Sequence, residues 1–297
     1  MLENLQGFHI EPTNICTLQC PRCTRTKFIE QFPKQWKNQQ LDLQSFKKFI
    51  DIDIKSKLFY LCGNYGDPIY YSDIFEMLHW IKEHDANVTI VTNGSYKSAA
   101  WWNELRSILN QNDTVVFAID GVPSNFTEYR INADWKSIEL GITTIVKYVN
   151  TTWKFIPFKF NETSIEQARA LSKDLGMTSF EIAPSNRWES PQDPLKSHIS
   201  DRSYEKKVNW FSNVDYELDP KCKTTNYQHF ISADGYYMPC CFAGDHRFYY
   251  ASEFYKNKQM YNISTSTISS VIESLTSFYD NLEKTKPKYC TFNCPQI

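Results

Sequence analysis

Short apolar runs alternate with amphipathic segments over the first two thirds of the chain. Six runs rich in β-branched and aromatic residues have the length of buried strands. They are GFHIEPT, KLFYLCGN, VTIVTNG, TVVFAID, WKFIPFKF and SFEIAP, between Gly7 and Pro184. Between them apolar residues recur at helical spacing, as in Leu43/Phe46/Ile50, Ile74/Leu78/Ile81 and Trp101/Leu105/Leu109. The alternation predicts six strand–helix units around a parallel sheet, an α/β fold.

One helix has clear start and stop signals. After the fifth run, Thr163 and Glu166 have the spacing of a capping box, and Gly176 is placed to end the helix. The apolar face of this helix is formed by Ile165, Ala168, Leu171 and Leu175.

The pattern changes after Pro184. Residues 185–221 are polar and contain three prolines, which indicates a bridge or an active-site cover between a first domain, 1–184, and a last one, 222–297. In the last domain HFISADGYYMPCCF predicts a hairpin. A helix is expected to follow on Ile268, Val271, Ile272, Leu275, Phe278 and Leu282.

Composition and charge exclude several classes of protein. The 297 residues carry a formal net charge of -2, so the chain lacks the basic excess typical of nucleic-acid binding, and we expect no nucleic-acid partner. The first residues lack the basic start and apolar run of a signal peptide, and no apolar stretch reaches about twenty residues. We therefore expect a cytoplasmic protein without a membrane partner.

Nine cysteines are the most informative residues. Cys16, Cys20 and Cys23 form CTLQCPRC directly after the first predicted strand. In a reducing compartment such a cluster indicates a metal site rather than disulfides. Three thiolates can hold a four-iron cubane with one iron open to a ligand. A structural zinc site, which needs a fourth ligand, is the alternative.

The CxxxCxxC loop after the first strand resembles that of the radical S-adenosylmethionine (SAM) superfamily. The resemblance implies a partial (β/α)6 TIM-like barrel and a catalytic [4Fe–4S] cluster on Cys16, Cys20 and Cys23. In this family SAM binds the free iron, and its reductive cleavage gives a 5′-deoxyadenosyl radical. The chain departs from the family at Arg22, because an aromatic residue usually precedes the third cysteine.

The second strand is followed by a motif similar to the family's Gly-Gly-Glu-Pro sequence, which holds the amino group of SAM. In GNYGDPIYY the matching residues are Gly66, Asp67 and Pro68. Glycine lets backbone carbonyls approach the ammonium closely, and proline fixes the turn. The alternative is an ordinary turn. Cys62, inside the apolar run before this motif, is expected to pack as a small hydrophobe.

Three further residues at or beyond strand ends are implied to contact SAM. Asn93 in TNG and Asp120 in FAIDG would meet the ribose hydroxyls, or would only shape turns. Ala118 replaces a serine that relatives often carry near the ribose. Arg130 in SNFTEYR is implied to clamp the SAM carboxylate, because a guanidinium meets a carboxylate with two parallel hydrogen bonds. A surface arginine is the alternative.

The C-terminal cysteines resemble the auxiliary-cluster extension called SPASM, or its shorter twitch form. Twelve residues separate Cys222 from Gly235 and four separate Gly235 from Cys240, and CTFNC follows near the end. Adjacent side chains on a strand point to opposite faces, so Cys241 is expected to be excluded. One auxiliary [4Fe–4S] cluster is thus implied on Cys222, Cys240, Cys290 and Cys294. A zinc knuckle of the same residues is the alternative.

The resemblance implies an oxidoreductase-type enzyme that abstracts hydrogen from an unactivated C–H bond, giving oxidation, a cross-link or epimerisation. The first strand begins near Gly7, which leaves no room for a peptide-recognition domain and favours a small molecule or short peptide as substrate. Modification of a larger peptide or protein partner, and a non-catalytic zinc- or cluster-stabilised binding protein, are the alternatives. An electron donor such as flavodoxin or ferredoxin is expected. Substrate contacts, or a plain surface loop, are expected at Asn186, Arg187, Trp188 and Glu189.

Overall fold

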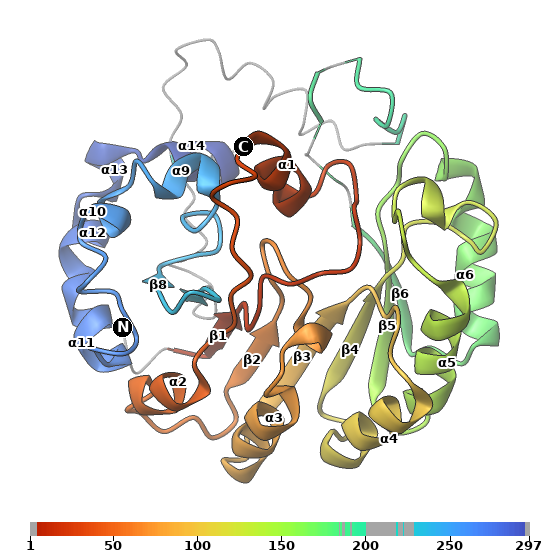
Figure 1. The fold of residues 1–297 in the computed structure, drawn as a ribbon, viewed down its shortest axis with the longest axis horizontal. Coiled ribbons are helices and arrows are strands. Elements are labelled where there is room, and N and C mark those ends of the chain that lie inside the picture. Colours follow the sequence, from red (N-terminus) through yellow and green to blue (C-terminus); the bar gives the residue numbers. More distant parts are fainter. Residues whose placement is uncertain are drawn as a thin grey trace. The chain divides into compact units, whose positions relative to one another are not determined.

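The computed structural model describes residues 5–183, 185, 188–190, 192–199, 218, 222 and 229–294. The chain divides into two compact units, each built from segments that are far apart in the sequence. Unit 1 comprises Met1–Ile15, Lys37–Asn87 and Ser212–Ile297, and unit 2 comprises Cys16–Trp36 and Val88–Phe211. The cysteine loop at 16–23 therefore lies in unit 2, and the GDP sequence at 66–68 lies in unit 1. Figure 1 labels the elements.

Unit 2 is a run of parallel strands with helices between them. Its strands are β3 (Asn87–Thr92), β4 (Thr114–Ala118), β5 (Asn150–Phe155) and β6 (Ser179–Ile182), which neighbour one another in that order. Its helices are α1 (Thr24–Gln31), α4 (Ala99–Ile108), α5 (Trp135–Ile145) and α6 (Ile165–Asp174). Buried aromatic rings such as Trp102, Phe117 and Trp153 fill the space between strands and helices.

Unit 1 contains the first two strands and the C-terminal hairpin in one sheet. The strand order is β2 (Leu58–Leu61), β1 (Gly7–Ile10), β7 (Phe230–Ile231) and β8 (Tyr237–Met238). The β1 strand is parallel to β2 and β7, and β7 is antiparallel to β8. The predicted hairpin is thus present, and it extends the sheet at the edge of β1.

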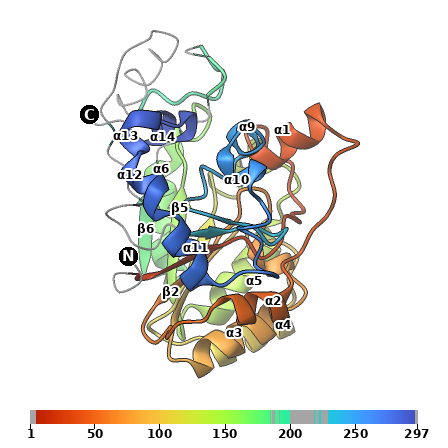
Figure 2. The ribbon, with the colours of Figure 1, turned by 90° about the vertical axis from the view of Figure 1, so that its left-hand side faces the viewer.

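Helices of unit 1 follow the strands in two groups. The first group is α2 (Leu43–Phe49) and α3 (Ile74–Glu83). The second group follows the hairpin and consists of α9 (His246–Tyr249), α10 (Glu253–Lys256), α11 (Ile268–Ser274), α12 (Thr276–Asp280), α13 (Leu282–Thr285) and α14 (Lys288–Asn293). Figure 2 shows α11, α12 and α13 following one another along this unit.

Three details differ from the sequence prediction. The expected long helix from Ile268 is divided into α11, α12 and α13, with breaks at Leu275 and Asn281. The capping box is not formed, because Thr163 lies in a 3-10 turn (Glu162–Ser164) and Ser164 is the residue before α6. The fifth strand ends at Phe155, five residues before the end of the predicted run WKFIPFKF, since Pro157 has no N–H to continue the ladder.

The main expectation, a mixed α/β fold with mostly parallel strands, is confirmed. The helix end expected at Gly176 is also present, with a φ of +77° that suits glycine. The domain boundaries at 184 and 221 fall on residues outside those described and stay predictions. In the described part of the chain, no helix has the length and apolar character needed to cross a membrane.

Candidate functional site

The three-cysteine loop of unit 2 is compact. The N–H of Cys23 donates to the carbonyl of Cys20 at 3.0 Å, which closes a turn between the second and third thiols. The N–H of Leu18 donates to Cys16 Sγ at 3.5 Å. The loop ends at the start of α1, with Cys23 as its N-cap residue. Cys20 is buried, whereas Cys16 and Cys23 are half-buried. The loop therefore presents three thiols from eight residues, a donor set that fits a cubane with one open iron.

Asn93 lies beside the first thiol. Its Nδ2 atom is 3.7 Å from Cys16 Sγ, and its Oδ1 accepts the N–H of Ser95 at 2.9 Å. Asn93 is buried directly after β3. It thus shapes the turn after the strand, as one reading of the sequence expected, and also faces a predicted cluster ligand.

Asp120 and Arg130 form a buried ion pair beside the second thiol. Arg130 Nε donates to Asp120 Oδ2 at 2.6 Å, and the N–H of Ile156 donates to Asp120 Oδ1 at 2.9 Å. Burial raises the pKa of Cys20 to about 11, although the charge of Arg130 and its hydrogen bond to the thiol act in the opposite direction. Arg130 is therefore not a surface arginine. It is a cation fixed by Asp120 next to the loop.

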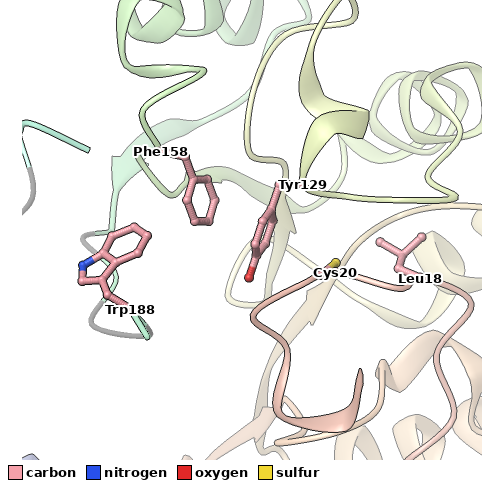
Figure 3. Packing of buried hydrophobic residues seen from close by; sticks show 5 residues of the cluster. All are labelled: Leu18, Cys20, Tyr129, Phe158 and Trp188. Atoms are coloured by element: carbon pink, nitrogen blue, oxygen red, sulfur yellow. The ribbon is translucent and has the colours of Figure 1, made fainter. Parts of the chain in front are cut away.

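An aromatic cluster packs against the same loop (Figure 3). Tyr129 stacks on Phe158 with 4.1 Å between ring centroids, and Trp188 meets Phe158 edge to face at 5.7 Å. Leu18 and Cys20 belong to the same buried cluster. Of the predicted substrate-contact segment, Trp188 thus lies in this cluster, whereas Asn186 and Arg187 lie outside the described residues.

The GDP sequence of unit 1 is held against the residues that precede Cys16. A Cβ atom on Gly66 would lie 1.8 Å from the carbonyl oxygen of Thr13, so only glycine fits there. The N–H of Asp67 donates to the carbonyl of Ile15 at 2.9 Å. The Asp67 carboxylate also accepts the N–H of Ile69 at 3.2 Å and caps a 3-10 turn that begins at Pro68. The local backbone thus requires glycine at position 66, and the Asp67 carboxylate stabilises the turn that follows.

Glu11 is a functional candidate that the sequence reasoning missed. It follows β1 directly, is 1% exposed, and accepts the N–H groups of Tyr65 (2.7 Å) and Gly66 (3.2 Å) on Oε1. Burial raises the pKa of Glu11 to about 7, against the opposing effect of these hydrogen bonds. A carboxylate immediately after the apolar run GFHI was the available signal. Glu11 fixes the loop that carries the GDP sequence.

The C-terminal cysteines lie near one another in unit 1. Burial raises the pKa of Cys240, and the charges of Cys241, Cys222 and Cys290 raise it further. The N–H of Cys294 donates to the carbonyl of Cys290 at 2.8 Å. The hydroxyls of Tyr237, Tyr279 and Tyr289 also lie within electrostatic reach of these thiols. The four cysteines predicted for the auxiliary cluster are thus close in space, in a setting of thiols and phenols.

The loop after Cys240 also contacts the loop that carries the GDP sequence. Asn64 Nδ2 donates to the carbonyl of Cys241 at 2.8 Å, and the N–H of His246 donates to the Tyr65 hydroxyl at 2.9 Å. Unit 1 therefore joins the predicted SAM amino-group loop to the predicted auxiliary-cluster loop through direct hydrogen bonds.

The nine cysteines, all within the described part of the chain, carry thiols rather than disulfides. Among the described residues, no three His, Cys, Asp or Glu side chains are grouped closely enough to hold a single metal ion. A cubane takes each thiolate on a different iron, and therefore spreads its ligands more widely than one ion does. Cys62 follows β2, where its N–H donates to the carbonyl of Ile10 at 3.0 Å.

Comparisons with known proteins bear on the C-terminal cysteines and on the fold. Residues 222–295 match the model of the SPASM iron–sulfur cluster-binding domain. A comparison with curated protein sequences finds no match.

Solved structures similar to this chain include three different proteins, all at low sequence identity. Streptococcus suis SuiB bound to S-adenosylmethionine has a TM-score of 0.58 and 13% identity, with 80% of this chain and 60% of SuiB covered. The protein anSMEcpe with bound AdoMet and Cp18Cys peptide has a TM-score of 0.59 and 15% identity, with 90% of this chain and 80% of anSMEcpe covered. The protein BtrN in an open conformation has a TM-score of 0.51 and 14% identity, with 99% of this chain and 94% of BtrN covered.

The chain spans about 60% of the length of SuiB, so these likenesses concern the fold. SuiB and anSMEcpe hold SAM in these structures, and the match at residues 222–295 agrees with the expected auxiliary iron–sulfur cluster. The chain shares the α/β fold of these solved structures, and its residues 222–295 match the SPASM iron–sulfur cluster-binding domain, as the sequence resemblance predicted.

Proposed function

We propose that this protein is a radical SAM enzyme with its catalytic [4Fe–4S] cluster on Cys16, Cys20 and Cys23. An auxiliary [4Fe–4S] cluster would be held by Cys222, Cys240, Cys290 and Cys294. When bound, the catalytic cluster and SAM together supply a 5′-deoxyadenosyl radical, which abstracts hydrogen from an unactivated C–H bond of the substrate.

One observation carries the proposal. Three thiols lie in one eight-residue loop, with the Asn93 amide 3.7 Å from Cys16 Sγ and the Arg130 cation beside Cys20. A structural zinc site has no need of a buried cation next to its thiolates. A cluster that binds a charged amino acid does, because a cation offsets the negative charge gathered by thiolates and a carboxylate.

The chain's own residues would bind and orient SAM. We assign its amino group to the loop of Gly66, Asp67 and Pro68, which Glu11 fixes through backbone hydrogen bonds. Arg130, oriented by Asp120, would attract the SAM carboxylate. Asn93 and Asp120 were predicted as ribose contacts. Each already binds a neighbouring group, which supports a second role for both in fixing the turns around the site.

Exclusion of water is a further task of these residues. The cluster of Leu18, Tyr129, Phe158 and Trp188 buries Cys20 on one side of the loop. Burial of this kind protects a reactive species from side reactions with solvent.

The substrate class that we propose is a small molecule or a short peptide, modified by oxidation, cross-linking or epimerisation. A larger peptide or protein partner is the second candidate. It is favoured by two similar structures, SuiB bound to its precursor peptide SuiA and anSMEcpe with its Cp18Cys peptide. A flavodoxin- or ferredoxin-type donor would supply the electron.

The test is anaerobic reconstitution, followed by iron and sulfide analysis and measurement of 5′-deoxyadenosine formed from SAM with dithionite. We expect about eight irons per chain for two clusters. The control is the Cys16→Ala/Cys20→Ala/Cys23→Ala variant, which should form no 5′-deoxyadenosine. A fully iron-loaded wild-type protein that does not cleave SAM would contradict the enzymatic function and favour a cluster-stabilised binding protein.

A further inference from the structure

The residue before the third cysteine, Arg22, makes a two-pronged ion pair. Its Nε donates to Asp193 Oδ2 at 3.0 Å and its Nη2 donates to Asp193 Oδ1 at 3.2 Å. Nη2 also lies 3.3 Å from Glu189 Oε2. The Arg22 side chain is only 13% exposed. Arg22 is thus directed onto the segment that follows β6, described at residues 188–190 and 192–199, which we call the post-β6 segment.

Asp193 is the centre of that segment. Its side chain is fully buried, and each oxygen accepts one Arg22 donor and one backbone donor. The N–H of Glu189 donates to Oδ2 at 2.8 Å, and the N–H of Leu195 donates to Oδ1 at 2.9 Å. Burial opposes ionisation of Asp193, but the Arg22 and backbone hydrogen bonds outweigh it and keep its pKa below the usual range. Without Arg22, this arrangement would bury an uncompensated charge.

The post-β6 segment leads back to the cysteine loop. Trp188 precedes Glu189 and packs edge to face on Phe158, which stacks on Tyr129. Tyr129 and Cys20 lie in the same buried cluster (Figure 3). The contacts therefore form a closed path from Arg22 through Asp193 and Trp188 to Cys20, two residues before Arg22.

A second charge supports the same end of the segment. Lys27, on α1, lies 2.8 Å from Glu189 Oε1. This pair is more exposed, with 34% of the Lys27 side chain and 55% of the Glu189 side chain accessible. Exposed pairs contribute little, so we attribute the fixation of Glu189 to Asp193 and Arg22. The far end is held separately, by the N–H of Lys159 donating to the carbonyl of Leu195 at 3.1 Å.

We propose that Arg22 is a positioning residue: through Asp193 it holds the post-β6 segment and Trp188 over the cysteine loop, and so limits access to the cluster on that loop. An aromatic residue at this position could pack against a ligand. Arg22 is instead committed to Asp193. That the loop carries a cluster rests on the proposed function, whereas the Arg22–Asp193 contact does not.

The first test is hydrogen exchange of the full-length wild-type chain and its variants, read by mass spectrometry. In Arg22→Ala we expect the Glu189 amide to exchange about tenfold faster or more, because a charge-assisted hydrogen-bond network is lost. The amide of Ile119, which donates to the carbonyl of Lys154 at 3.0 Å, is the internal control and should keep its protection. Asp193→Ala should have the same effect as Arg22→Ala, and the double variant should exceed neither. If the Glu189 amide of Arg22→Ala exchanges at the wild-type rate, the proposal is overturned.

Three matched variants separate the pair from simple packing. Arg22→Lys keeps the positive charge but cannot make both hydrogen bonds to Asp193. It should give a Glu189 exchange rate between those of the wild type and Arg22→Ala. Lys27→Ala removes only exposed pairs, those with Glu189 and Glu30, and should change the exchange rate of the Glu189 amide less than twofold. Arg22→Phe introduces the aromatic residue typical of the family and should behave as Arg22→Ala does. Restoration of wild-type protection by phenylalanine would contradict positioning through Asp193.

The second test concerns access to the cluster. Iron release from the reconstituted protein to a ferrous chelator is followed without oxygen, and the iron missing in the Cys16→Ala/Cys20→Ala/Cys23→Ala variant is assigned to the loop. In Arg22→Ala the iron assigned to the loop should be released several-fold faster, because the post-β6 segment is no longer held over the loop. An unchanged rate would overturn the access role. Because exchange needs neither iron nor SAM, a protein that fails to cleave SAM would contradict the proposed function and leave the Arg22–Asp193 test intact.

Discussion

The two cysteine groups of this protein lie in different chemical settings. Around Cys20 in unit 2 there are fixed charges, the Arg130–Asp120 pair among them. Around Cys240 in unit 1 the neighbours are other thiols and tyrosine hydroxyls, and burial dominates. The difference indicates separate tasks. A charged surrounding suits a site that must attract and orient an ionic cofactor, whereas a neutral and aromatic one suits a group that is enclosed on all sides.

The largest effect expected from this contrast is the selective loss of one cluster. The Cys16→Ala/Cys20→Ala/Cys23→Ala variant should fall from about eight irons to about four and lose SAM cleavage, as the remaining thiols hold one cubane. Iron analysis and electron paramagnetic resonance would measure this. The matched variant, Cys222→Ala/Cys290→Ala, should keep about four irons on the loop. Equal iron loss from both would mean that the two groups do not form separate sites.

The second effect tests the buried charge. Arg130→Met should destabilise the chain by about 3–5 kcal/mol, because the buried Asp120 carboxyl, whose pKa burial already raises, would lose the cation that offsets its charge. Denaturant unfolding of the metal-free chain would measure it. Lys55→Met serves as the control, since both side chains of its pair with Asp85 are exposed and the pair should contribute under about 1 kcal/mol. Similar losses for both variants would remove the electrostatic distinction between the regions.

The third effect concerns pH and Glu11, a carboxylate buried beside the loop that carries the GDP sequence. Glu11 has a pKa of about 7 in the folded chain and 4.5 as its reference value, so the folded state binds more protons between these pH values. The contribution of Glu11 to stability is therefore largest below pH 4.5 and falls by about 3 kcal/mol as pH rises to 7. His9 and His229, whose pKa values burial lowers to about 4, contribute in the opposite direction, so the test is the difference between each variant and the wild type. Glu11→Gln should remove the Glu11 contribution, whereas the exposed Glu30→Gln should follow the wild type. Unfolding free energies of the wild type and both variants, measured at pH 4.5, 6 and 7.5, test this prediction.

The smallest effect concerns the contact within unit 1 between the two loops. Tyr65→Phe removes the acceptor of the His246 N–H and should cost about 1 kcal/mol of unfolding free energy. The exposed Tyr250→Phe is the control and should be neutral. If both variants unfold like the wild type, the Tyr65 hydroxyl does not stabilise the loop after Cys240.

Local patterns were sufficient to predict much of this molecule. Strand and helix positions followed from apolar periodicity, and Gly235 was expected in a hairpin, where its φ of +79° now places it. The breaks at Leu275 and Asn281 were not predictable, because the apolar spacing continues across them. The cysteine groups could be proposed because their spacing is local or resembles a family pattern.

Local sequence patterns could not predict the contacts between residues that are far apart in the sequence. Glu11 binds backbone groups 54 and 55 residues away, and Arg22 binds Asp193 at a separation of 171 residues. Neither partner is marked by a local motif, since an aspartate between prolines and a glutamate after a strand are common in loops. Only the folded chain reveals that both carboxylates are buried and accept backbone N–H groups.

The pairing of β7 with β1 affects how this fold can be divided or recombined. The N–H groups of His9 and Glu11 donate to the carbonyls of His229 and Ile231, each at 2.8 Å. A chain cut before residue 222 would expose these donors along a parallel edge, and bare edges of that kind invite intermolecular strand addition. The C-terminal region is thus an integral edge of the sheet, and grafting it onto another barrel requires a matching first strand.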